Sequence, residues 1–332
     1  MDLYLFHHDE YLRLYNCSFK TREEWSKYGV VNFALGEMFL VTGSLYIAFY
    51  IPILYVMSMK ELIKHSCFKI MFFLGLIDIS STIVSCIIAG YMGIRGAVGC
   101  NNIEFLYFVG SFGVALWFCQ SATCALLAVN RCIDSFYPKL SQILFSGKKT
   151  LFWIFGCFVS IGMAYFFDPY FAIPHEEVPI DRSPYFGTFH SINNIAIVII
   201  LPLLYGFLIA TIMWKKREVN SYSRMQTQLL FQVFWICMLI FVSASIYVYM
   251  QFFPIPDILI VIAQICWQCS NGGAVIIYLT LNKTIRRGVI KIFCSSFINS
   301  TTSGVSRMNT YDVARTGGHL NKVGTVNTES NC

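Results

Sequence analysis

The sequence predicts an all-α membrane protein in which seven transmembrane helices form one bundle. Composition is the first observation: of 332 residues, 56% are hydrophobic and only 13% are charged, about half of the quarter that soluble domains carry. Such a chain cannot cover a soluble surface with charge. The length of its apolar runs and the distribution of its basic residues then give the number of spans and their orientation.

Seven apolar runs that contain no Lys or Arg are long enough to cross a bilayer, whose hydrocarbon core takes about 20 residues of helix. The least separated are the last two, which a Pro-Ile-Pro-Asp stretch at 254–257 divides. One helix through both runs would be about 80 Å long, more than twice the thickness of that core, so the prolines mark a turn. The predicted spans cover residues 33–57, 70–93, 101–130, 150–167, 191–214, 227–253 and 258–281.

The basic residues predict the orientation, because Lys and Arg are enriched in cytosolic loops. With the N-terminus outside and the C-terminus in the cytosol, 18 of the 24 Lys and Arg residues fall on the cytosolic side and 6 on the outer side. The net charge of +6 therefore reflects the orientation of the chain in the lipid bilayer, and nucleic acid is not an expected partner.

The spans divide the chain into three parts. Residues 1–32 form an extracellular N-tail, and residues 33–293 form the bundle, which ends in a short helix on the membrane surface. Residues 294–332 form a cytosolic tail; from residue 295 it has 12 Ser and Thr, four Gly and few apolar residues, which predicts disorder. Phosphorylation there would recruit an arrestin-like protein; the alternative is a plain solvated tail.

One acidic residue lies deep in a predicted span. Asp78 is eight residues into the second run, about 12 Å from its start, so it must face the bundle interior and find partners there. Ser270 and Asn271 of the last run are the partners that we expect. The interpretation is an internal functional switch, with a purely structural aspartate as the alternative.

No motif indicates catalysis or a cofactor. The sequence has no HExxH, GxSxG or GxxxxGK[ST] stretch. Cys266 and Cys269 form a CxxC pattern, but on a membrane helix without a second pair this favours packing. We expect no enzymatic activity, no cofactor and no metal site.

The inner end of the third span carries an arginine motif, Leu-Ala-Val-Asn-Arg-Cys over residues 127–132. Arginine at this place, followed by a short basic loop, resembles the D/E-R-Y signature of G-protein-coupled receptors. The segments 65–78, 247–254 and 276–286 make the resemblance narrower. Together they resemble the nematode serpentine receptor class T chemoreceptors, over about residues 16 to 291.

The resemblance implies a receptor that binds a small chemical from outside and activates a heterotrimeric G protein inside. Arg131 would contact the C-terminal helix of the G protein once the fifth and sixth helices move apart. Lys215, Lys216 and Arg224 would flank that cleft, or act only as positive-inside anchors. The implied location is the plasma membrane, including the cilia of sensory neurons.

Two positions depart from the receptor pattern. Asn130 replaces the usual acid and cannot hold Arg131 by charge, and the nearby Asp134 would add only a few tenths of a kcal/mol as an exposed i,i+3 pair. We therefore expect a loosely held resting state with basal signalling. Tyr278, a candidate switch residue, lacks the proline that precedes it in NPxxY, and the glycines at 272–273 would supply flexibility instead.

The cysteines suggest one bridge. Among 13 cysteines, only Cys17 and Cys100 fall in predicted outer segments. Most seven-helix receptors link the outer end of the third helix to the second outer loop, but here that loop, residues 168–190, has no cysteine. We therefore predict a Cys17–Cys100 disulfide, with two free thiols as the alternative.

Two sites suit covalent modification. Asn16 begins an Asn-Cys-Ser sequon in the N-tail, which is either glycosylated or bare. Cys294 follows Arg286, Arg287 and Lys291 on the predicted surface helix, where palmitoylation and an unmodified thiol are equal alternatives.

The ligand site should lie in the outer halves of the helices, where a few polar groups interrupt an apolar lining. The absence of a charged cluster there favours a neutral or weakly polar small molecule. The candidate contacts are Phe112, Trp117, Asn193, Asn194, Tyr249, Gln251, Gln264 and Trp267.

Two other functions remain open at this point. An odorant-gated ion channel of inverted seven-helix topology would place the N-terminus inside, against the distribution of basic residues. A membrane transporter or membrane enzyme would use the carboxylate of Asp78.

Overall fold

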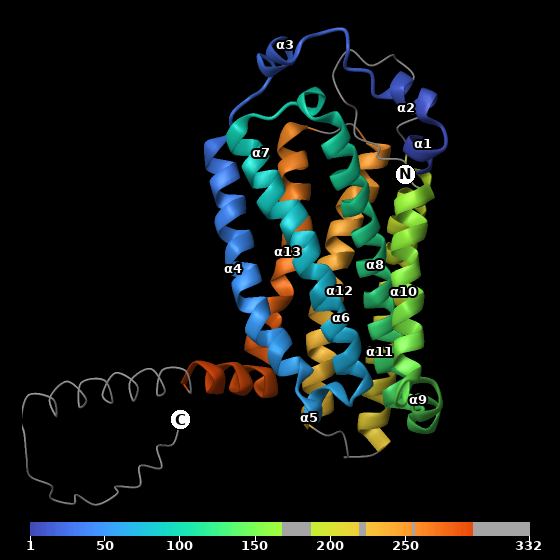
Figure 1. The fold of residues 1–332 in the computed structure, drawn as a ribbon. Helices are drawn as coiled ribbons and strands as arrows, with labels where there is room; N and C mark the ends of the chain where they lie inside the picture. The colour runs from blue at the N-terminus through green and yellow to red at the C-terminus, as the bar shows by residue number, and fades with distance from the viewer. Residues whose placement is uncertain (168–186, 219–223, 254–255, 295–332) are drawn as a thin grey trace, which may run out of the picture.

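The computed structural model describes residues 1–167, 187–218, 224–253 and 256–294; the predicted disordered tail from residue 295 lies outside them. Every described element is helical (Figure 1). The elements are α1 (Asp2–Leu5), α2 (His8–Leu14), α3 (Arg22–Ser26), α4 (Phe33–Ser58), α5 (Lys60–Ile63), α6 (Ser66–Thr82), η1 (Ile83–Ile88), α7 (Ala89–Arg95), η2 (Gly99–Asn101), α8 (Ile103–Phe136), α9 (Pro138–Phe145), α10 (Lys149–Phe167), α11 (Thr188–Glu218), α12 (Arg224–Phe252) and α13 (Asp257–Leu281).

The long helices are the predicted spans. Six of them are long and apolar enough to cross a membrane, and α9 with α10, which meet at 67°, form a seventh if they count as one bent span. The prediction of an all-α bundle of membrane-spanning helices is therefore confirmed. The ends differ by a few residues, most at α8, which continues to Phe136, past the predicted end at 130.

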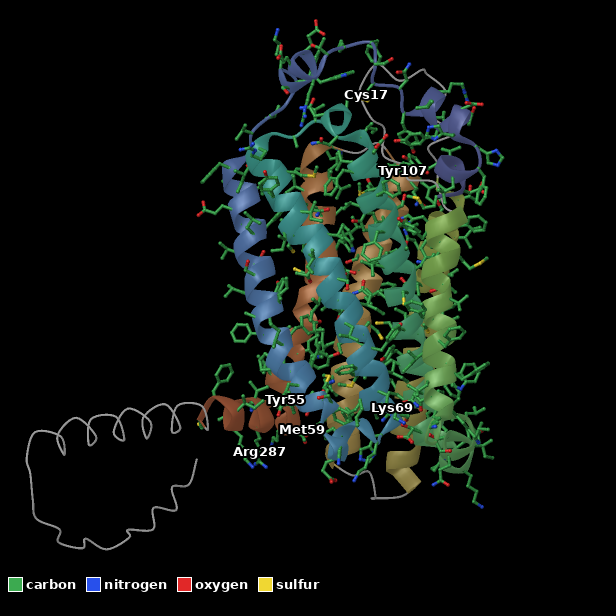
Figure 2. All side chains as sticks on the ribbon, viewed as in Figure 1. Cys17, Tyr55, Met59, Lys69, Tyr107 and Arg287 are labelled. Carbon is green, nitrogen blue, oxygen red and sulfur yellow. A yellow bond between two sulfur atoms is a disulfide. The ribbon has the colours of Figure 1, made fainter. Side chains whose placement is uncertain are left out.

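The two ends of the bundle are distinct. Figure 1 shows α1, α2 and α3 together at one end and the last described helix, residues 283–294, at the other. We name these the outer and the inner end, after the predicted orientation. Cys17 and Tyr107 lie at the outer end, and Lys69 and Arg287 at the inner end (Figure 2).

α8 is the central helix of the bundle. It packs against α6, α10, α11 and α12, and its buried side chains include Gln120, Asn130 and Arg131. Because buried polar groups need hydrogen-bond partners, these three side chains fix where polar contacts form inside the bundle.

The second span is wound irregularly. α6 passes into the π-helical segment η1 before the span continues as α7, where the sequence predicted one uninterrupted run. A π-turn uses i→i+5 hydrogen bonds in place of i→i+4. It therefore changes which side chains face the bundle beyond it, and hydropathy does not report such a change.

α13 approaches its neighbours closely at two glycines. A Cβ at Gly272 would overlap the ring of Tyr46 on α4, and a Cβ at Gly273 would lie 2.9 Å from Cδ1 of Leu239 on α12. Neither glycine has a positive φ. The structure thus gives them a role in close packing, where the sequence suggested flexibility.

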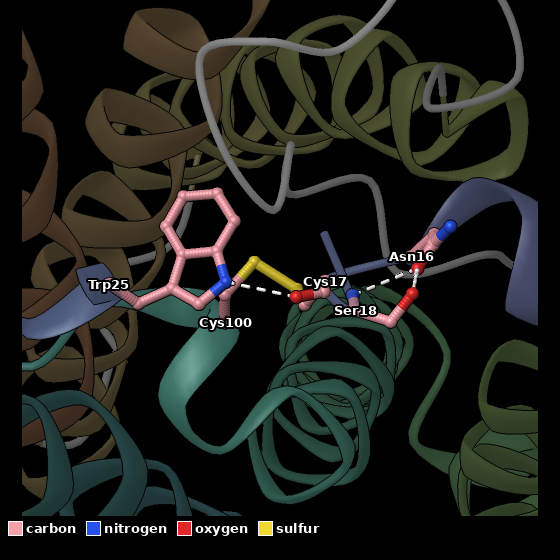
Figure 3. Close-up of a disulfide and its surroundings, with 5 residues drawn as sticks. All are labelled: Asn16, Cys17, Ser18, Trp25 and Cys100. Carbon is pink, nitrogen blue, oxygen red and sulfur yellow. Dashed lines mark hydrogen bonds between the residues drawn. A yellow bond between two sulfur atoms is a disulfide. The ribbon is translucent and has the colours of Figure 1, made fainter. Parts of the chain in front are cut away.

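The N-tail packs onto the outer end of the bundle. A Cys17–Cys100 disulfide, with the Cα atoms 5.4 Å apart, joins it to the turn before α8 and links the two cysteines that the sequence pairs (Figure 3). The indole Nε1 of Trp25 donates to the Cys17 carbonyl at 3.0 Å. Tyr11 of α2 and Tyr107 of α8 are both buried in a T-shaped contact, with ring centroids 5.0 Å apart.

A short helix follows α13, as predicted, over residues 283–294. Asn282 caps it, because its Oδ1 accepts from the Ile285 amide at 3.0 Å. The Nδ2 of Asn282 also donates to Gln232 Oε1 of α12 at 2.8 Å. Ile285 and Val289 are buried, so the helix is anchored to the inner end of the bundle.

Candidate functional site

A largely apolar cavity of about 510 Å³ lies in the outer half of the bundle. Its volume falls within the range of roughly 300–1,000 Å³ that is typical of small-molecule sites. No Asp, Glu, Lys or Arg is among the described residues that line it. The lining residues are Val84, Ile88, Ala89, Met92, Leu106, Val109, Gly110, Gly113, Val114, Trp117, His190, Tyr247, Ile260, Gln264 and Trp267.

The polar groups of this outer cavity are carried mainly by aromatic side chains. The Trp117 Nε1 donates to the buried Asn194 Oδ1 at 2.7 Å. The rings of His190 and Tyr247 meet edge to face at 6.0 Å. The Trp267 Nε1 is buried and has no hydrogen-bond partner within the described part of the chain. This indole N–H is therefore a donor at the cavity that a bound molecule could satisfy.

Three predicted ligand residues, Trp117, Gln264 and Trp267, line the outer cavity. Asn194 supports it from behind by accepting the hydrogen bond from Trp117. Of the lining residues, His190 lies on α11 and Tyr247 on α12. The sequence suggested Tyr249 for this part of α12.

The remaining candidates do not line the cavity. Phe112 is 41% exposed, Asn193 donates to Ser121 Oγ at 3.3 Å, and the Tyr249 ring stacks on Phe253 with centroids 4.7 Å apart. Gln251, near the end of α12, is also absent from the lining. These helices carry apolar side chains on every face, so their hydropathy does not show which face points inward.

Asp78 is only 1% exposed, so its side chain faces the interior of the bundle. The Tyr50 hydroxyl of α4 lies 2.7 Å from its Oδ2, and the Gln120 Nε2 of α8 donates to its Oδ1 at 2.7 Å. The carboxyl group thus joins α6 to α4 and α8. We call Tyr50, Asp78 and Gln120 the Asp78 cluster.

The expected partners on α13 contact this cluster differently from the prediction. The Ser270 hydroxyl donates to the Trp267 carbonyl at 2.8 Å, and the Asn271 Nδ2 donates to Ser85 Oγ at 3.2 Å. Their backbone carbonyls, not their side chains, reach the cluster: Gln120 lies 3.3 Å from Ser270 O and Tyr50 2.8 Å from Asn271 O. The register of α13 turns both side chains away from Asp78.

Tyr278 is fully buried on the inner side of the Asp78 cluster. Its hydroxyl has no hydrogen-bond partner among the residues that the structure describes. A buried hydroxyl without a partner is unfavourable by about 1–3 kcal/mol. The conformation described here therefore leaves one group at this position that another conformation could satisfy.

A second cavity, of about 300 Å³, lies at the inner end and includes Arg131, Asp134 and Gln228 in its lining. Arg131 is 6% exposed. The Asn130 Oδ1 accepts from its Nε at 3.2 Å and its Nη2 at 2.6 Å, and Asp134 Oδ2 lies 3.3 Å from its Nη1. Asn130 also donates to Ser66 Oγ at 3.1 Å. The uncharged Asn130 thus holds Arg131 by hydrogen bonds. The expectation of a loosely held resting state considered only charge and did not include these bonds.

The other predicted inner residues lie at the ends of two helices. Lys215 and Lys216 fall in the last turns of α11 and Arg224 begins α12, but their side chains lie outside the described residues. Cys294 is the last described residue of the surface helix.

At the outer end, Asn16 is exposed, and its Oδ1 accepts from the Ser18 amide at 2.9 Å (Figure 3).

The sequence comparisons decide the family. Residues 2–302 match the family described as "Serpentine type 7TM GPCR chemoreceptor Srt". The chain belongs to this family. The receptor is also similar to serpentine receptor class T-55 of Caenorhabditis elegans, with 26% identity over 286 residues, covering 82% of this chain and 78% of that relative.

Family membership agrees with the resemblance found in the sequence and makes the chain a multi-pass membrane receptor. The family is one of G-protein-coupled receptors and not of enzymes. It therefore decides against the alternatives of a membrane enzyme, a transporter or an inverted channel.

Several residues of the receptor's sites were missed by the sequence interpretation. Gln120 is a lone amide in an apolar run, and such polar residues inside a span are a usable signal of internal contacts. Tyr50, His190 and Tyr247 give no such signal, because tyrosine and histidine occur equally well at lipid interfaces and in cores. Only the arrangement of the helices identifies them.

Proposed function

We propose that the receptor binds a small, neutral, largely apolar molecule in the outer cavity and activates a heterotrimeric G protein at the inner cavity. The observation that carries this proposal is the arrangement of the two cavities, one at each end of the bundle, with the Asp78 cluster between them. A receptor needs both sites and a route between them.

The lining of the outer cavity supports the ligand class. A charged ligand would leave its charge without a partner, because the described lining residues carry no charged group and an unpaired buried charge is strongly unfavourable. The Trp267 Nε1 supplies a donor. The ligand class that fits is an apolar molecule with a hydrogen-bond acceptor, such as a ketone, an ester or an ether.

Arg131 carries the proposed G-protein contact. Its guanidinium lines the inner cavity and can donate several hydrogen bonds to carbonyl or carboxylate groups of an inserted helix. Separation of α11 and α12 would widen the cavity for that helix. Lys215, Lys216 and Arg224, at the adjoining ends of the two helices, would flank it.

The test is expression of the receptor with a promiscuous G protein and a calcium reporter, during a screen of neutral volatile compounds. We expect a ligand-evoked response that Arg131→Ala abolishes. Trp267→Phe, which keeps a ring but removes the donor, should raise the half-maximal concentration about tenfold, the loss of roughly 1.4 kcal/mol.

Trp235→Phe is the matched control, because Trp235 is 47% exposed on α12 and does not line the cavity. It should leave the half-maximal concentration unchanged. A calcium response that the ligands evoke in cells that express the receptor without any G protein would contradict the proposal.

We also propose three modifications and a location for the receptor. Glycosylation of Asn16 is supported by its exposure, and removal of the glycan should shift the apparent mass in the wild type but not in Asn16→Gln. Palmitoylation of Cys294 and phosphorylation of the tail, with recruitment of an arrestin-like protein, are proposed from the sequence. The proposed location is the plasma membrane, including sensory cilia.

A further inference from the structure

Three amide side chains of α13 converge on one residue of the π-helical segment. The Ser85 carbonyl accepts from Gln264 Nε2 at 2.9 Å and from Gln268 Nε2 at 2.8 Å. The Ser85 hydroxyl accepts from Asn271 Nδ2 at 3.2 Å. We call these contacts the Ser85 latch. It fixes η1 of the second span to α13.

The latch fits the geometry of both helices. Positions 264, 268 and 271 follow the i, i+4, i+7 spacing that places side chains on one face of a helix. A carbonyl oxygen has two lone pairs, so both glutamine amides can bond Ser85 at once. Ser85 and Asn271 are fully buried and Gln268 is 4% exposed, so water does not compete strongly for these bonds.

The latch contacts the outer cavity at one end and the Asp78 cluster at the other. At its outer end, Gln264 lines the outer cavity together with Val84 and Ile88 of η1. At its inner end, the Asn271 carbonyl lies 2.8 Å from the Tyr50 hydroxyl, which belongs to the Asp78 cluster. A continuous chain of hydrogen bonds therefore leads from the cavity wall to the centre of the bundle.

We propose that Gln264 is a positioning residue that couples the outer cavity to the Asp78 cluster through Ser85. This rests on the proposed ligand site. A ligand that takes the Gln264 amide away from Ser85 loosens η1 from α13, and the change reaches Asn271 and the Asp78 cluster. Glutamine at 264 thus serves the ligand and the latch with the same group.

Native cysteines allow the coupling to be measured without a ligand. Cys86 follows Ser85 in η1, and Cys124 lies one turn beyond Gln120 on α8; both are fully buried. Cys157 on α10 is an internal reference. The receptor in lipid nanodiscs is treated with N-ethylmaleimide, and the alkylation rate of each cysteine is followed by peptide mass spectrometry.

Gln264→Met keeps the length of the side chain but removes its donor. We expect the alkylation rates of Cys86 and Cys124 to rise about threefold to tenfold, the change expected from loss of one buried hydrogen bond, and that of Cys157 to stay constant. Gln264→Asn, whose amide is too short to reach Ser85, should act in the same way and covers the case in which the first variant does not fold.

Gln251→Met is the matched control, because it makes the same chemical change on α12, away from the latch. It should leave all three rates at the wild-type value. An unchanged rate at Cys124, or an equal rise in Gln251→Met, would overturn the proposal. No ligand or G protein takes part in this experiment, so its failure leaves the proposed function standing, and failure of the ligand screen does not alter its result.

Discussion

Two buried tyrosines form a matched pair for testing the polar interior of the bundle. Tyr50 and Tyr278 are both 0% exposed. The Tyr50 hydroxyl lies 2.7 Å from Asp78 Oδ2 and 2.8 Å from Asn271 O, whereas the Tyr278 hydroxyl has no partner in the part of the receptor that the structure describes. Substitution by Phe removes only the hydroxyl, so Tyr50→Phe should lower the free energy of unfolding and Tyr278→Phe should not.

The magnitudes follow from the hydrogen-bond inventory. Tyr50→Phe leaves a buried oxygen of Asp78 without its donor, which lowers the free energy of unfolding by about 1–3 kcal/mol. Tyr278→Phe removes a buried hydroxyl that makes no hydrogen bond, and is neutral or raises that free energy by about 1 kcal/mol. At roughly 2–4 °C per kcal/mol, Tyr50→Phe lowers the Tm by several degrees and Tyr278→Phe does not lower it.

Thermal unfolding in detergent, followed with a thiol-reactive fluorescent dye, measures both changes, because buried free cysteines such as Cys86 and Cys124 react once the bundle opens. Wild type and both variants are heated at one scan rate. Equal losses of Tm in Tyr50→Phe and Tyr278→Phe, or a larger loss in Tyr278→Phe, would refute the hydrogen-bond assignment of the Asp78 cluster.

Three further substitutions test other parts of the structure. Cys17→Ser opens a loop closed over a sequence separation of 83 residues and should lower the free energy of unfolding by about 2–5 kcal/mol; an unchanged non-reducing peptide map would contradict the bridge. Gly272→Ala places a methyl against Tyr46 and should lower the Tm by the equivalent of about 1–3 kcal/mol, whereas an unchanged Tm would show that the helices do not meet there. Asn130→Asp puts a negative charge beside the Arg131 guanidinium, which now bonds a neutral amide oxygen, and the added Coulomb attraction should lower basal nucleotide exchange on the G protein; an unchanged basal rate would remove Asn130 from control of the resting state.

The spans were predictable because a bilayer demands long apolar helices and the sequence contains few alternatives. The run at 101–130 was predicted too short, since α8 continues to Phe136 through polar residues that a span does not require. The π-winding of Ile83–Ile88 was not predictable, because it changes hydrogen bonding without changing hydropathy.

The disulfide was predictable from compartments, since Cys17 and Cys100 are the two cysteines assigned to outer segments. The packing of the N-tail was not, because contacts such as Tyr11 with Tyr107 join residues that lie far apart in the sequence.

The sequence predicted how deep the site residues lie in the membrane, but not which face of each helix carries them. Asp78 was identified because a carboxyl group inside a membrane must be buried and bonded, yet its partners Tyr50 and Gln120 depend on the rotation of α4 and α8. For the same reason, the sequence could not show that Trp267 lines the outer cavity and that Gln251 does not. Uniformly apolar helices do not encode their rotation in a polar face.

Nucleotide exchange by the purified receptor tests the central claim most directly. The receptor is reconstituted with a heterotrimeric G protein, and GTP analogue binding is measured with and without an active compound from the neutral screen. We predict ligand-stimulated exchange in the wild type, a curve shifted to about tenfold higher concentration in Trp267→Phe, and no stimulation in Arg131→Ala. Stimulation that is identical in all three proteins would contradict a ligand site in the outer cavity that signals through Arg131.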